Sequence, residues 1–340
     1  MKDMKRHILS LSHEGINKTS VRIRQLLFLI LMLFVFFFPA FIKNQYILRM
    51  GILTILYGGL ALSLNLVSGF LGQVSLGHAA FLGIGAYTSA LLSLHFKLPF
   101  LVTASAAVLM SAIFGVLLGL PALKLSGSYL AIVSMGFCEI IRLVELNWGS
   151  LTRGPMGLTN IRRPVILGME IRSGAGFYYL CIILVAIICF ISTTLLRSYA
   201  GRAIKSIRED PVAASFMGIN IFAWKVFVFS LSAGMVGLLG AFYAHYVRFI
   251  DPSVFNFDQS TSILCMVIVG GSGSIVGSFL GSLLLSVVPE LLRNLSGARM
   301  LVYGLVMAAM VVFRPQGILG QKTLAQLLGM EKKYAKPDKE

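Results

Sequence analysis

Apolar runs long enough to cross a membrane follow one another along the chain, and shorter polar segments separate them. A spanning helix needs roughly 20 mostly apolar residues, so this pattern predicts an all-α, polytopic transmembrane helical bundle. Because glycines interrupt one run, we count it as two short passes and expect about 8–10 membrane elements, with broken or re-entrant helices. The runs occupy residues 26–42, 47–67, 75–94, 101–120, 129–148, 176–196, 221–246, 260–288 and 300–313.

Composition supports a membrane protein. Hydrophobic residues make up 57% of the chain and charged residues 12%, whereas a soluble domain carries about 25% charged residues. Such a chain could not cover a water-exposed surface, and disorder would require low hydrophobicity. The four cysteines lie inside apolar runs without C-x-x-C spacing, and the five histidines show no metal-ligand spacing. We therefore expect neither a metal site nor a redox pair.

Lys and Arg, which give the chain its net charge of +16, gather at the ends of apolar runs. There they set topology and contact anionic lipid head groups. Nucleic acid binding is not expected, because no basic stretch is interleaved with aromatic residues. The basic segments 1–25, 197–220 and 314–340 are predicted to be cytoplasmic, with both termini, and 26–313 to form the membrane domain. Segment 149–175 is then an outer loop, although it carries four arginines.

Segment 63–85, SLNLVSGFLGQVSLGHAAFLGIG, places polar residues inside two expected membrane passes. Polar groups at membrane depth are tolerated only when they are buried in protein or line a cavity. One interpretation is a broken helix on a permeation path; the other is a short hairpin whose polar side chains cap the next helix. For His78 alone, a packed and hydrogen-bonded histidine is favoured. The candidate path residues are Asn65, Gln73, Ser75 and His78.

Segment 268–277, IVGGSGSIVG, is interrupted at Gly270, Gly271 and Gly273. Short hydrophobic segments broken by glycine indicate transport sites, so these three glycines join the candidate path. The alternative is a tight turn between two short helices.

Run 129–148 carries Glu139, Arg142 and Glu145 at spacings of three. Arg142 can pair with either carboxylate along a helix. We favour a neutralising triad near the outer end of the span over a gating or proton-relay role, because charges in a span are costly unless they are compensated.

Segment 201–218, GRAIKSIREDPVAASFMG, contains the signals of a short capped helix. Asp210 suits the N-cap, Pro211 the first helical position and Gly218 the position after the last turn, which predicts about seven helical residues. Val212 and Phe216 form an apolar stripe, typical of a docking helix; the alternative is a surface helix packed on its own bundle. The candidate docking residues are Gly201, Arg202, Arg208, Glu209, Asp210, Val212, Ala213, Ala214, Phe216 and Gly218.

Nucleotide and covalent chemistry have no recognisable motif in this chain. The string GILGQKT at 317–323 has the wrong spacing for a phosphate-binding loop, and no nucleophile elbow G-x-S-x-G stands between a strand and a helix. We expect no catalytic residue and no enzyme activity.

Four strings together resemble branched-chain amino acid ABC transporter permeases of the LivM type. They are SLNLVSGFLGQVSLGHAAFLGIGAYTSALL at 63–92, GRAIKSIREDPVAASFMGIN at 201–220, VIVGGSGSIVGSFLG at 267–281 and RPQGILG at 314–320. The likeness covers about residues 51–320. The chain departs from the family at Ser215 and Phe216, where smaller or acidic residues are usual. It departs again in LTRGPMGL at 151–158, where Arg153 replaces a commoner glycine.

The resemblance implies a permease subunit of an ATP-driven importer in a bacterial inner membrane. Its partners would be a sister permease, two cytoplasmic ATP-binding subunits and an extracytoplasmic substrate-binding protein, with a branched-chain amino acid as substrate. ATP and Mg²⁺ would be held by the ATPases, and this chain would bind no cofactor. Residues 197–220 would be the coupling segment, with 201–218 touching an ATPase, and the path would pass near Asn65, Gln73 and His78.

Three other interpretations stay open. A urea or short-amide ABC permease would share the same motifs. A stand-alone secondary transporter would need membrane carboxylates, for which Glu139 and Glu145 are the candidates. A membrane-embedded enzyme would show clustered histidines and acids, and the sequence shows none.

Overall fold

The computed structural model describes residues 37–39, 44–122, 128–166, 168–291, 304, 308 and 317–318. The predicted runs 26–42 and 300–313 and the C-terminal tail lie outside the described residues, apart from isolated positions. The chain divides into one unit of Met1–Asn44 with Lys322–Glu340, and a second unit of Gln45–Gln321. All labelled elements belong to the second unit.

Four helices in the described residues are long and apolar enough to cross a membrane. They are α2 (Gln45–Asn65), which continues into the π-helix η1 (Leu66–Phe70), α4 (Phe100–Ala122), α7 (Gly174–Arg197) and α10 (Ile221–Val247). A fifth span results if α11 (Phe257–Gly270) and α12 (Ile275–Leu291), bent by 119° at a short break, count as one. The prediction of a polytopic helical bundle with broken helices is confirmed.

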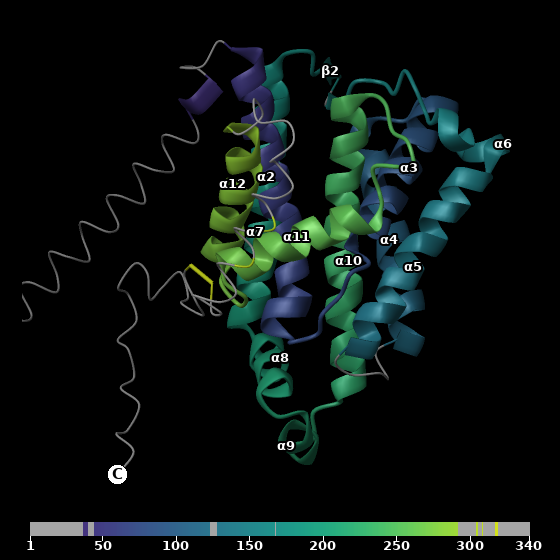
Figure 1. Cartoon of the computed structure of the whole chain (residues 1–340). Coiled ribbons are helices and arrows are strands. Elements are labelled where there is room, and N and C mark those ends of the chain that lie inside the picture. Colours follow the sequence, from purple (N-terminus) through teal and green to yellow (C-terminus); the bar gives the residue numbers. More distant parts are fainter. Residues whose placement is uncertain are drawn as a thin grey trace, which may run out of the picture. The chain divides into compact units, whose positions relative to one another are not determined.

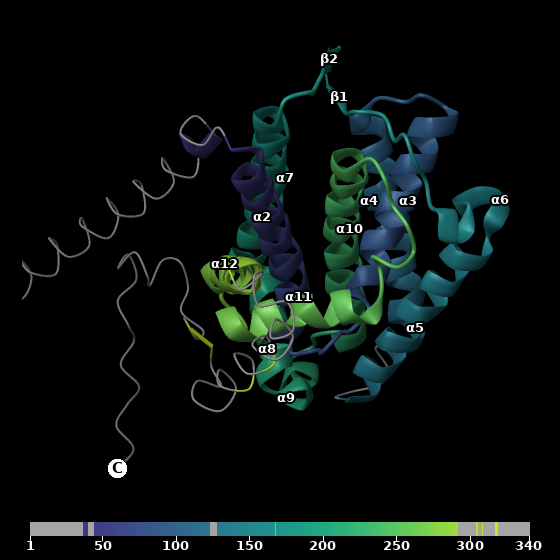
Figure 2. The same ribbon diagram turned by 45° about the horizontal axis from the view of Figure 1, so that its top comes forward.

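Two further helices, α3 (His78–His95) and α5 (Ser128–Asn147), run beside these spans. One end of the bundle carries α6 (Gly149–Thr152), the 3-10 turn η2 (Gly154–Met156) and the hairpin β1 (Val165–Ile166) and β2 (Met169–Glu170). The opposite end carries α8 (Tyr199–Glu209) and α9 (Pro211–Phe216). Figures 1 and 2 show these two ends, which we call the hairpin end and the α9 end.

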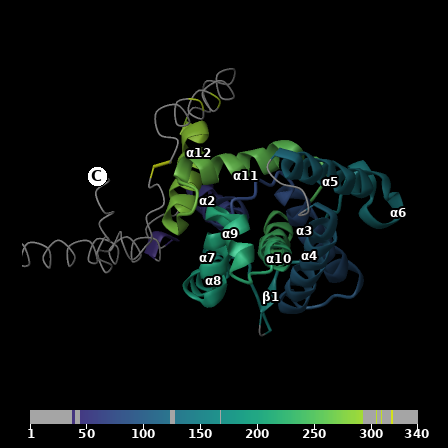
Figure 3. The same ribbon diagram turned by 90° about the horizontal axis from the view of Figure 1, so that it is seen from below.

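Small residues let α10 approach its neighbours closely. Seen from below, α10 lies between α3 and α4 on one side and α7 on the other (Figure 3). An added methyl group at Gly240 would run into the backbone of Leu82 on α3, and one at Gly237 into Ser111 on α4. Such contacts hold helices together where lipid gives no hydrophobic drive between them.

Helix bounds follow the apolar runs. Run 129–148 became α5, 176–196 became α7 and 221–246 became α10, each to within two residues. Pro121, expected to end its run, sits in the last turn of α4. Run 260–288 splits at residues 271–274, where the glycines were expected to break it.

Candidate translocation and coupling sites

The two broken segments meet at Asn65. Its Nδ2 donates to the carbonyl of Ser274 and to Oγ of Ser278, both at 2.9 Å, and its Oδ1 accepts from the backbone N–H of Gly273 at 2.9 Å. All four residues are buried. One side chain therefore fixes the break between α11 and α12 against the end of α2.

Glycine is required around this contact. Gly69 in η1 lies so close that an added methyl group would overlap Asn65 Oδ1 and the backbone of Gly273. Gly271 and Gly273 have φ of 117° and 87°, which L side chains rarely adopt. Of the predicted path glycines, Gly271 and Gly273 are thus required by backbone shape. Gly270 is required by packing, since an added methyl group there would overlap the Gly277 carbonyl. π-Helical turns such as η1 occur frequently at functional sites.

His78 forms a buried chain with three serines. Its Nε2 lies 2.9 Å from Oγ of Ser232, whose hydroxyl donates to the carbonyl of Ser63 at 2.6 Å, and its Nδ1 lies 3.2 Å from Oγ of Ser75. Because the Ser232 proton goes to Ser63, we assign the ring proton to Nε2, which leaves Nδ1 to accept from Ser75. His78 is thus a packed, hydrogen-bonded histidine between α3, α10 and α2.

Gln73 lies in the turn that leads into α3. Its backbone N–H donates to the carbonyl of Val67 at 2.9 Å, and its side-chain Oε1 is buried without a hydrogen bond in the described part of the chain. The N-cap of α3 is Gly77, whose N–H reaches Ser75 Oγ at 3.4 Å. Next to Gln73, Gly72 has φ of 77°, and an added methyl group there would lie 3.1 Å from Cγ of Arg208. The turn therefore rests on α8.

The short helix α9 forms as its capping residues predict. Asp210 accepts from the backbone N–H groups of Val212 and Ala213 at 2.8 and 3.1 Å, Pro211 starts α9, and Gly218 has φ of 78°. The helix has six residues, against about seven expected.

An apolar stripe is exposed on α9. Val212 is 62% exposed and Phe216 85% exposed, while Ala214 is buried against the bundle. Arg202, which lies over the Tyr199 ring, Glu209 and Ala213 are also exposed. Gly201 is buried at the corner where α8 leaves α7. The predicted docking residues thus lie together at the α9 end.

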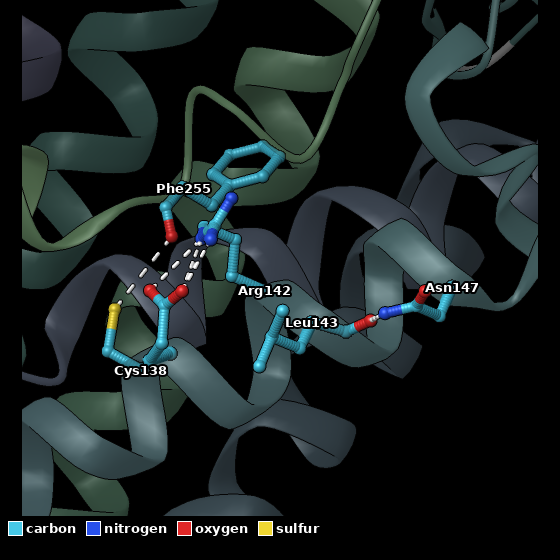
Figure 4. A network of polar contacts seen from close by, with 6 residues as sticks. Cys138, Arg142, Leu143, Asn147 and Phe255 are labelled. Carbon is cyan, nitrogen blue, oxygen red and sulfur yellow. Dashed lines mark hydrogen bonds and ion pairs between the residues drawn. The ribbon is translucent and has the colours of Figure 1, made fainter.

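On α5, Arg142 pairs with only one of its two neighbours. Its Nε donates to both carboxylate oxygens of Glu139 at 3.1 and 3.0 Å, and the second guanidinium nitrogen completes the ion pair (Figure 4). Glu145 makes no such bond: it is 5% exposed, and both of its oxygens are buried without a partner among the described residues. The neutralising triad is corrected to a pair plus a single buried carboxylate.

Helix geometry places the two carboxyl groups on different sides of α5. Successive residues turn by about 100° around a helix, so Glu139 and Glu145 lie about 120° apart. The Glu139 and Arg142 side chains, 44% and 27% exposed, lie on the outward side of α5. Glu139 stands about 17 Å along α5.

A groove of about 400 Å³ lies between α4, α7 and α10. Apolar side chains wall it, among them Ile187, Ile191 and Phe227, which are exposed. It offers a polar solute almost no hydrogen-bond partner, so we do not place the path there. The described ranges also contain no group of three or more His, Cys, Asp and Glu side chains that could hold a metal.

The hairpin end carries the expected outer loop. Arg153 has φ of 60°, the left-handed conformation that favours glycine. This backbone shape is a physical reason for the commoner glycine at its place. Leu158 bridges to Ile250 and so joins the loop to the segment before α11. On the surface, hydrogen bonding to Arg172 lowers the pKa of the Glu170 carboxyl.

Some neighbours of the site were not expected from the sequence. Ser232 completes the His78 chain from α10, and Gly83 and Phe255 cover Glu145. A serine within an apolar run was the available signal for Ser232. Nothing local marks Phe255, since it reaches α5 from a distant connection.

A multi-pass helical membrane bundle and a family match together place the chain among transport permease components. Residues 46–313 match the model of the family described as "Branched-chain amino acid transport system / permease component", and the chain belongs to this family.

Curated relatives agree. The chain is 35% identical over 320 residues to the high-affinity branched-chain amino acid transport system permease protein LivM of Escherichia coli (strain K12), covering 87% of this chain and 75% of that protein. It is 27% identical over 308 residues to the autoinducer 2 import system permease protein LsrC of Shigella flexneri, covering 85% and 86%. The fructose import permease protein FrcC of Rhizobium meliloti is 29% identical over 126 residues, 35% of each chain. No solved structure matches the chain.

Proposed function

We propose that the chain is a permease subunit of an ATP-driven importer of the bacterial inner membrane, and that its substrate is a branched-chain amino acid. The family and the identity to LivM support the substrate class. ATP coupling rests on one observation above all, the capped helix α9, which exposes Val212 and Phe216 at one end of a membrane bundle.

α9 is the contact for a cytoplasmic ATPase. An aromatic ring left in water is favourable to bury, and a short rigid helix that presents such a ring fits into a groove of a partner. The ATPases bind ATP and Mg²⁺, since this chain has no phosphate-binding loop motif. Two of them, with a sister permease and an extracytoplasmic binding protein, complete the importer.

The outward side of α5 faces the sister permease across the path. This assignment follows from the Glu139–Arg142 pair, which needs protein or water beside it. The hairpin end, with loop 149–175, then receives the binding protein, and the α9 end and both termini are cytoplasmic.

Movement of α9 reaches the path through packed contacts. α8 joins α9 and supports the turn at Gly72. The same turn follows η1, and Asn65, just before η1, holds the break between α11 and α12. Alternating access follows when ATP favours one arrangement of these contacts over the other.

Cross-linking tests this proposal. The chain is reconstituted with candidate ATPases, a sister permease and a binding protein, and cysteine is placed at Val212 or Phe216. Both variants should form an adduct with an ATPase. Met169→Cys, at the hairpin end, is the matched control and should form none, since the exposure of Met169 lies between those of Val212 and Phe216.

Uptake of labelled leucine is measured in the same vesicles. We expect uptake that requires ATP and that excess isoleucine or valine suppresses. Uptake independent of ATP, with no ATPase adduct, would refute the importer. ATP-dependent uptake suppressed by urea and not by valine would favour the urea or short-amide permease.

A further inference from the structure

Glu145 is a buried carboxyl group without a hydrogen-bond partner in the described structure. Both oxygens are out of contact with water, and neither has a hydrogen-bond partner in the described ranges. The nearest guanidinium, that of Arg142, is held by Glu139. An isolated buried carboxylate is expensive, and ionisable groups inside a membrane are commonly functional.

The surroundings of Glu145 contain a second polar group in the same condition. An added methyl group at Gly83 would lie 2.5 Å from Glu145 Oε1 and 3.1 Å from the Phe255 ring, so α3 and Phe255 cover the carboxylate. Tyr87 follows one turn later on α3, with its ring 6.0 Å from that of Phe255. Its hydroxyl is also buried without a partner among the described side chains.

Glu145 and Tyr87 both lie beside Phe255. Two carboxylate oxygens and a phenol oxygen offer acceptors, and a group with several N–H donors and a positive charge would satisfy them together. A primary ammonium group has these properties.

We propose that Glu145, with Tyr87, receives the ammonium group of a zwitterionic amino acid during transport, while Arg142 receives its carboxylate. The proposal rests on the proposed function and names the residues that read the substrate's charges. Side chains three apart on a helix lie about 5–6 Å apart at Cβ, so a small zwitterion can lie between Arg142 and Glu145. Glu139 holds Arg142 when no substrate is bound.

This contact changes with conformation. In the described structure Gly83 and Phe255 cover Glu145, so the ammonium reaches it only when α5 and α3 separate. Substrate then binds one arrangement of the helices more tightly than the other, and a transport cycle requires such a difference.

Competition binding tests the proposal on the complete transporter without ATP. Labelled L-leucine is displaced by leucinol, which keeps only the ammonium, or by 4-methylpentanoate, which keeps only the carboxylate. Glu145→Gln should weaken the binding of leucinol at least tenfold and change the affinity for 4-methylpentanoate by less than twofold. Arg142→Gln should weaken the binding of 4-methylpentanoate and leave that of leucinol nearly unchanged. Tyr87→Phe should weaken the binding of leucinol about threefold.

Glu170→Gln, an exposed carboxylate at the hairpin end, is the matched control and should change neither competitor. A structural role for Glu145 would weaken both analogues equally or neither, and either result overturns the proposal. Unchanged leucinol binding in both Glu145→Gln and Tyr87→Phe overturns it as well.

Wild-type leucine uptake separates the two proposals. If the wild-type transporter shows no ATP-driven leucine uptake, the proposed function fails. If uptake is normal but the two variants do not show the crossed pattern, only the assignment of Glu145 and Arg142 fails.

Discussion

Asn65 and Glu145 are both buried among helices, but their surroundings differ. Asn65 uses both N–H donors and its carbonyl oxygen, and every partner belongs to the α11–α12 break or to the first turn of α12. Glu145 uses neither oxygen. A satisfied buried polar group specifies one arrangement of the chain, whereas an unsatisfied one lowers stability and is retained when function needs it. Asn65 therefore holds the chain in one arrangement, whereas Glu145 is where we expect substrate to bind.

The largest loss of stability should come from adding bulk beside the buried Asn65 side chain. Gly69→Ala would push a methyl group into Asn65 Oδ1 and the backbone of Gly273, and we expect about 3 kcal/mol of destabilisation or more. Thermal unfolding of the purified protein in detergent measures this. Gly136→Ala on α5 meets nothing within 4 Å and should be neutral or slightly stabilising. Equal melting temperatures would show that Asn65 fixes nothing.

Removing the Asn65 amide should cost somewhat less. Asn65→Ala leaves the Gly273 N–H and two acceptors without their partner, and we expect about 2–3 kcal/mol of destabilisation. Asn147→Ala, which removes one exposed hydrogen bond to Leu143, should change stability by less than about 0.5 kcal/mol. If both variants unfold at the same temperature, the buried hydrogen bonds of Asn65 do not contribute more to stability than an exposed one.

Removing the acidic group of Glu145 should act in the opposite direction. Glu145→Gln keeps the shape and removes a buried acid that is costly to ionise, so we expect stabilisation by about 1 kcal/mol. Glu139→Gln, which leaves Arg142 without its partner, should destabilise slightly. If the Glu145→Gln protein melts at a lower temperature than the wild type, the carboxyl group makes a stabilising contact. Glu145 would then not differ from Asn65 in the way described.

A change on α9 should leave stability nearly unaffected and abolish coupling. Phe216 is exposed, so Phe216→Ser should alter unfolding by less than about 0.5 kcal/mol. ATP-driven uptake in proteoliposomes should fall at least tenfold, and Phe216→Leu should retain most of it. Full activity of Phe216→Ser would exclude the ring from the ATPase contact.

The smallest effect concerns the exposed Glu170–Arg172 pair. Because Arg172 lowers the pKa of Glu170, the pair stabilises the fold above the usual glutamate pKa of about 4.3 and loses this effect as pH falls through the lowered value. Exposure keeps the contribution small. Melting temperatures of wild type and Glu170→Gln between pH 3 and 6 should differ slightly at the upper end and converge at the lower end.

Local signals predicted much of this fold. Apolar run length fixes most of the helix bounds, and the order Asp210, Pro211, Gly218 determines α9, because caps and backbone preference act within a few residues. The contact of Asn65 with Gly273 could not be predicted from the sequence, since it depends on packing between segments 208 residues apart. The pairing of Arg142 with Glu139 in place of Glu145 depends on which side of α5 faces α3, and spacing alone leaves that open.

The π-helix η1 also has a consequence for register. Its Leu71 N–H reaches the carbonyl of Leu66, five residues back, so the turn holds one residue more than a regular α-helix would. That extra residue sets the chain before and after it out of phase by about 100°. Shortening η1 by one residue would leave α2 intact but rotate the segment leading to Gln73 by about 100° relative to Asn65. The number of residues between α2 and α3 therefore helps to determine how the two broken segments meet.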